Sequence, residues 1–122
     1  MRKTALSALF FASSLAFSTS HAVAEMQAEI NHLLSYVETS NCTFIRNGSA
    51  HSGPNAKEHI VKKYNYFKDR ISSAEQFIEY AATKSTMSGK KYKVRCDGKE
   101  YLTAQWLNDE LKHYRNNIGS SN

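Results

Sequence analysis

Residues 44–70 read FIRNGSAHSGPNAKEHIVKKYNYFKDR, and this stretch predicts a strand, a polar loop and a helix in succession. A β-branched and aromatic run at its start favours the strand, and Asn-Gly at 47–48 is typical of a tight turn. Ser-Gly-Pro at 52–54 predicts a helix start, because proline fits the first turn and either preceding residue can cap it. The polar loop therefore lies beside the positive end of a helix dipole and is the best candidate for a functional surface.

The N-terminus has the pattern of an export signal. Residues 1–3 include two basic side chains, and the apolar run at 5–17 is too short to span a bilayer comfortably. Small residues then precede a suitable cleavage point. The sequence predicts a signal peptide over 1–24, cut between Ala24 and Glu25.

The rest of the chain is expected to form a single small globular domain over 25–118, with a disordered tail over 119–122. Without Arg2 and Lys3 it carries 14 basic and 11 acidic side chains, a net charge of +3. So small an excess, in a chain predicted to be exported, argues against nucleic acid as a partner. Once processed, the chain is not expected to span a membrane.

Hydrophobic residues recur at spacings of three and four along four segments of the chain. This spacing predicts amphipathic helices, since such residues share one helix face. No internal repeat or low-complexity linker separates them. The helices are expected over 25–38, 54–70, 72–84 and 103–118.

Two helix starts carry capping signals. The third helix follows a capping-box pattern in which Ser72 caps the helix and Glu75 reaches back. Thr103 is expected to cap the last helix, because its hydroxyl can accept from the first free amides. The short connection between the second and third helices predicts an antiparallel or steeply angled pair.

Two strands are predicted, around 42–46 and over 92–96, and each contains one cysteine. An even number of cysteines in an exported chain favours a disulfide between Cys42 and Cys96. In an antiparallel pair with those cysteines opposite each other, Phe44 faces Val94. The predicted fold class is therefore mainly α (α+β), with about four helices, a short two-stranded antiparallel ribbon and one disulfide.

The clusters FIRNGSAH at 44–51 and AEQFI at 74–78, with Ser-Gly-Lys at 88–90, resemble the YfeK-like family. This is a family of small exported bacterial proteins with a domain of unknown function. The resemblance extends over about 44–95. It implies a periplasmic location and a shared small fold, and it implies no activity. Further residues that carry it are Ala56, His59, Ile60, Lys63, Arg70, Ile71, Tyr92 and Val94.

His51 and His59 are eight positions apart and are the candidate ligands of a metal site. A transition metal needs a third or fourth ligand, and the sequence nearby offers only Glu58. No metal and no other cofactor is therefore predicted. The two histidines are expected instead to form hydrogen bonds within the loop and beside the apolar stripe of the helix.

Catalytic patterns are weak in this chain. There is no GxSxG nucleophile elbow, and the S-x-x-K match at 88–91 falls before a strand rather than at a helix start. Glu75 and Glu79 lie on one helix face, but Glu75 is already expected to help cap that helix. The sequence does not decide whether the chain is an enzyme, and it favours a non-enzymatic role.

An anion-binding pocket is the sharpest site hypothesis. In the proposed register Arg46 faces Tyr92, and an arginine offers a two-pronged donor to carboxylate or phosphate. The alternative is that Arg46 pairs with Glu75, Glu79 or Asp69 and braces the loop. The predicted ligand-binding residues are Arg46, Asn47, His51, His59 and Lys90.

The favoured functional hypothesis is a non-enzymatic periplasmic binding or inhibitor-like interaction module that uses the loop at 46–51. Its partner would be another periplasmic protein or an anionic envelope component. The alternative is an envelope-acting enzyme of unidentified type with His51 or His59 as general base. A cleft joining these side chains to a carboxylate would favour the enzyme, and a loop closed by internal hydrogen bonds would favour a structural role for the motif.

Overall fold

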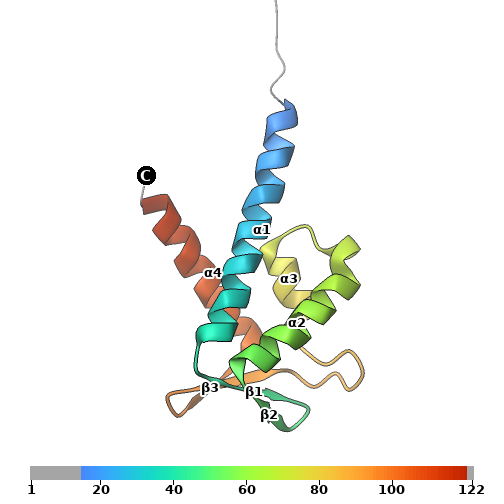
Figure 1. Cartoon of the computed structure of the whole chain (residues 1–122), viewed down its shortest axis with the longest axis vertical. Coiled ribbons are helices and arrows are strands. Elements are labelled where there is room, and N and C mark those ends of the chain that lie inside the picture. Colours follow the sequence, from blue (N-terminus) through green and yellow to red (C-terminus); the bar gives the residue numbers. More distant parts are fainter. Residues whose placement is uncertain (1–14, 121–122) are drawn as a thin grey trace, which may run out of the picture.

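The computed structural model describes the backbone of residues 15–120 and the side chains of 21–118. Four helices stand on one face of a four-stranded antiparallel sheet (Figure 1). This is the predicted mainly helical fold class with one disulfide. The elements are α1 (Leu15–Thr39), β1 (Thr43–Arg46), β2 (Ser49–His51), α2 (Gly53–Phe67), a 3-10 turn (Lys68–Arg70), α3 (Ala74–Ala81), β3 (Lys93–Cys96), β4 (Lys99–Leu102) and α4 (Thr103–Ser120).

The predicted ribbon is the central pair of the sheet, whose strand order is β2-β1-β3-β4. β1 and β3 are antiparallel with Phe44 opposite Val94, which confirms the predicted register. Cys42 and Cys96 form the predicted disulfide, with their Cα atoms 4.8 Å apart. Phe44 and Val94 are both buried, so this face of the central pair supports the core.

Two strands, β2 and β4, were not predicted. The first falls in the segment assigned to the polar loop, and the second lies between a predicted turn and a predicted helix start. Both follow tight turns in which two successive residues have positive φ, Asn47-Gly48 (51° and 80°) and Asp97-Gly98 (52° and 79°). Such turns match the twist of paired strands and therefore close hairpins.

The core lies between the helices and the sheet. The start of α2 packs closely on the end of α1. The approach is so close that a Cβ at Gly53 would lie 2.5 Å from the carbonyl oxygen of Val37. Glycine is therefore required at that position. The largest fully buried hydrophobic side chains are Phe77, Ile30, Leu33, Ile78, Leu107, Val37 and Val94.

The predicted cap of α3 is wrong by one residue. Ser73 is the N-cap, and its hydroxyl accepts a hydrogen bond from the backbone N–H of Gln76. The Gln76 side chain in turn accepts from the backbone N–H of Ser72 at 2.7 Å. Glu75 has no capping role and instead accepts from Arg115, which also pairs with Glu29.

The predicted cap of α4 is also wrong. Thr103 begins that helix, but its side chain is 2% exposed and its hydroxyl has no hydrogen-bond partner among the described residues. The cause is β4, which the sequence analysis missed. It carries the chain directly into the helix, and the backbone N–H of Thr103 donates to the carbonyl of Tyr92. Thr103 is therefore turned into the protein and away from the helix end.

The helix α1 runs through the predicted cleavage point between Ala24 and Glu25. Residues 21–25 are exposed, and among the side chains of α1 that the structure describes the first fully buried one is Ile30. No helix in the described part of the chain is both long and apolar enough to cross a membrane. The basic start of the predicted signal, at 1–3, lies outside the described residues. The tail predicted over 119–122 begins within α4, which extends to Ser120.

Reduction of the disulfide should destabilise the fold substantially. Cys42 and Cys96 are 54 positions apart, and closing a loop of this length contributes about 4 kcal/mol in the chain-entropy model. Urea unfolding with and without reductant measures this difference. The double variant Cys42→Ala, Cys96→Ala should unfold at the reduced midpoint and be insensitive to reductant. Equal midpoints for oxidised and reduced wild type would contradict the expectation.

Candidate functional site

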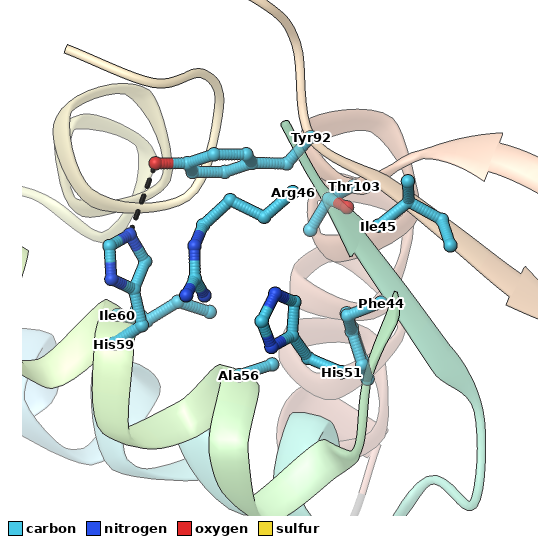
Figure 2. A pocket seen from close by; sticks show the side chains of 9 residues that line it. All are labelled: Phe44, Ile45, Arg46, His51, Ala56, His59, Ile60, Tyr92 and Thr103. Atoms are coloured by element: carbon cyan, nitrogen blue, oxygen red, sulfur yellow. Dashed lines mark hydrogen bonds between the residues drawn. The ribbon is translucent and has the colours of Figure 1, made fainter. Parts of the chain in front are cut away.

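A small pocket opens where the β1–β3 pair meets α2 (Figure 2). We call it the Arg46 pocket; its polar lining side chains are Arg46, His51, His59, Tyr92 and Thr103. Phe44, Ile45, Ala56 and Ile60 form its apolar walls. Its volume is about 20 Å³, which is enough for one or two water-sized groups.

Three elements bring the pocket together. Arg46 ends β1, and the tight turn that follows returns the chain so that His51 ends β2. Ser52 caps α2 by accepting from the backbone N–H of Asn55, and two turns into that helix His59 faces back toward the strands. Figure 2 shows the Arg46 side chain extending between Tyr92 and the two imidazole rings.

Tyr92 is the hydrogen-bond centre of the pocket wall. Its hydroxyl lies 3.2 Å from Nε2 of His59 and accepts from the Lys63 ammonium at 3.2 Å. Lys63 also donates to the carbonyl of Lys84 at 2.6 Å. The Tyr92 hydroxyl can donate its own proton to His59 when that imidazole is neutral. This chain of bonds thus suits a neutral His59.

Burial and the nearby positive charges keep both histidines neutral. Burial is the largest cause, and together with the charges of Arg46 and Lys63 it lowers the pKa of His59 to about 4. The pKa of His51 is also lowered, by burial and then by Arg46. At neutral pH the pocket therefore holds one guanidinium beside two uncharged imidazoles.

Arg46 has no acidic partner within the described residues, and no carboxylate lines its pocket. The predicted alternative, a bracing ion pair with Glu75, Glu79 or Asp69, is not found. Glu75 pairs with Arg115 at 2.7 Å instead. The buried Thr103 hydroxyl, which lines the same pocket, is likewise unpartnered.

Asn47 and Lys90 do not line the pocket. The Asn47 side chain accepts from the Ser88 hydroxyl at 2.6 Å, and that hydroxyl accepts from the backbone N–H of Lys90 at 3.2 Å. Lys90 is exposed. These bonds fasten the segment 85–91 to the β1–β2 turn, so of the five predicted ligand-binding residues the pocket brings together Arg46, His51 and His59.

Sequence reasoning missed Thr103 and Lys63 as parts of the site. Thr103 comes from a segment distant in sequence, whereas Lys63 lies one helical turn after His59 in α2, and both positions depend on how α4 and α2 pack around Tyr92. A signal existed for Lys63, which flanks the apolar stripe of α2 next to His59.

No feature that the structure describes in the Arg46 pocket favours catalysis or metal binding. A histidine base is usually oriented by a third group, and no carboxylate from residues 21–118 lines the cavity. A pKa of about 4 makes His59 a weak base at neutral pH. Within the residues that the structure describes, no three His, Cys, Asp or Glu side chains are grouped to hold a metal ion.

Comparison with known proteins defines the family. Residues 24–115 match the Family of unknown function (DUF5329), and the chain belongs to that family. It is also similar to the Uncharacterized protein YfeK of Salmonella typhimurium, with 39% identity over 70 residues. That alignment spans 57% of this chain and 58% of the relative. No solved structure matches. The resemblance seen in the sequence is thus confirmed, and the family match includes α1 from residue 24 onward and most of α4.

The neutral state of His59 predicts a pH dependence of stability. Its pKa falls from 6.5 in the unfolded chain to about 4 in the folded protein, so below pH 6.5 the unfolded chain takes up a proton first. The stability linked to His59 is complete above pH 6.5 and is lost as the pH falls through about 4. Urea midpoints measured from pH 7.5 to 4 should therefore fall less in His59→Gln than in wild type.

The control is His113→Gln, which removes an exposed histidine on α4 and should keep the wild-type slope. A His59→Gln variant whose midpoint falls as steeply as that of wild type would show that His59 is not held neutral.

Proposed function

We propose that this chain is an exported periplasmic binding protein that holds a carboxylate group of its partner in the Arg46 pocket. The observation that carries the proposal is the partly buried Arg46 beside the buried Thr103 hydroxyl, neither of which has an acidic or hydrogen-bonding side-chain partner among the described residues. Groups of this kind are costly to bury unless they are hydrogen-bonded. A bound anion would satisfy both.

The donors of the pocket suit an anion. Arg46 offers several N–H groups in a fixed fork, and charge-assisted bonds from arginine to carboxylate are among the stronger hydrogen bonds in proteins. Thr103 can donate its hydroxyl proton, and each neutral imidazole can donate from one ring nitrogen. The pocket also lies beside the N-terminal end of α2, whose dipole favours negative charge.

The size of the pocket favours a carboxylate over a larger anion. A cavity of about 20 Å³ accommodates one or two oxygen-sized atoms. The flat end of a carboxylate meets this limit better than a tetrahedral phosphate does. A peptide or an acidic envelope component would present such a group, so the partner is proposed to be a periplasmic protein or an anionic envelope polymer.

Two further features support the periplasmic location. The first 24 residues have the composition of a signal peptide, with the proposed cut between Ala24 and Glu25. The Cys42–Cys96 disulfide is in keeping with an oxidising compartment.

A matched pair of small probes tests carboxylate binding. N-acetylalanine carries a free carboxylate, whereas N-acetylalaninamide is uncharged and similar in shape. Titration followed by NMR should show saturable shifts at His51, His59 and Thr103 with the first probe and none with the second. Arg46→Gln should weaken the affinity by about tenfold or more, because hydrogen bonds to charged groups contribute about 1.5–3 kcal/mol.

The matched control is Arg70→Gln, which removes the same charge from an exposed position on the 3-10 turn. It should bind N-acetylalanine as wild type does. Equal binding of both probes, or unchanged affinity in Arg46→Gln, would reject the proposed function at this site.

A further inference from the structure

A second hollow lies at the opposite end of the same sheet face. Phe44 and Arg46 of β1 lie on one face, and Cys42, directly before the strand, continues the same alternation, so the disulfide and the Arg46 pocket mark the two ends of that face. The hollow beside the disulfide has a volume of about 560 Å³, within the usual range of ligand sites. We call it the Trp106 groove; its lining includes Tyr36, Asp97, Lys99, Tyr101, Trp106 and Asp109.

The groove has aromatic walls held in place by the core. The rings of Tyr36 and Trp106 are 4.5 Å apart, and Trp106 meets the buried Phe44 edge-on at 5.6 Å. Tyr101, on the edge strand β4, is 41% exposed. Packed aromatic rings of this kind offer contact surface at low entropic cost, and their faces attract cations.

The groove is acidic on a chain with an excess of basic residues. Asp97 and Asp109 line it, and neither forms an ion pair with any residue that the structure describes. Burial raises the pKa of Tyr36, and the nearby carboxylates of Glu110 and Asp109 raise it further. The electrostatic potential in the groove is therefore negative, although the whole chain carries a net charge of +5. Among the described lining residues, Lys99 is the one basic side chain.

We infer that the Trp106 groove binds an organic cation of the alkylammonium type, held by two carboxylates and by the faces of its aromatic walls. Aromatic rings alone would equally suit a neutral sugar. The two carboxylates form no ion pair with any described residue. They favour a cationic ligand over a neutral one, because a neutral ligand would leave them without a counter-charge. This site is independent of the carboxylate proposed at Arg46.

The tryptophan provides a direct test, because the chain contains only one and its emission therefore reports on this groove. Choline is the cationic probe, and 3,3-dimethylbutan-1-ol is its neutral isostere. Choline should change the Trp106 emission along a saturable curve, and the isostere should not. Asp97→Asn should weaken choline binding by roughly threefold, and Lys99→Gln should strengthen it.

The variants are chosen to keep the fold. Asp97 has a positive φ of 52°, a conformation that asparagine tolerates well. Asp69→Asn makes the same charge change at an exposed position outside the groove and should bind choline as wild type does. Arg46→Gln should also leave the choline response unchanged. A failure of the choline experiment would therefore leave the proposal of carboxylate binding at Arg46 unaffected.

Three results would overturn the inference. One is an absence of saturation with choline, and another is an equal response to the neutral isostere. The third is a saturable response to a neutral sugar such as maltose with none to choline, which would reassign the groove to carbohydrate.

Discussion

The antiparallel register of β1 and β3, fixed by the Cys42–Cys96 disulfide, is the constraint on which the rest of the structure depends. Because side chains alternate along a strand, this register places Phe44 and Val94 at the centre of the helix-covered face. Arg46 then falls at one end of that face and the disulfide at the other. A slip of one residue would turn Arg46 away from the helices. Both proposed binding sites are therefore consequences of one strand pairing.

The pairing was predictable because its signals are local and mutually consistent. Cysteine parity, alternation around Val94 and the β-branched run before Arg46 all pointed to the same register. The two outer strands were missed because β2 and β4 are short and polar, although both tight turns gave a hairpin signal that the sequence analysis did not use. The cap of α3 was placed one residue early, since two consecutive serines fit the same motif.

The candidate site was predictable in part, for a similar reason. Arg46, His51 and His59 come together because one turn and one helix start separate them in sequence. Asn47 sits in the turn itself and is directed to the neighbouring loop, where it bonds Ser88. Thr103 could not be found from sequence, because its burial depends on β4 leading directly into α4.

The central claim is that Arg46 is held against a neutral His59, without an acidic partner in the described part of the chain. The most direct test is an NMR pH titration of the His59 ring protons in wild type and in Arg46→Gln. The account predicts a pKa of about 4 in wild type and a higher pKa in the variant, since burial remains while one nearby positive charge is lost. A wild-type pKa near 6.5 that does not change in Arg46→Gln would contradict the account.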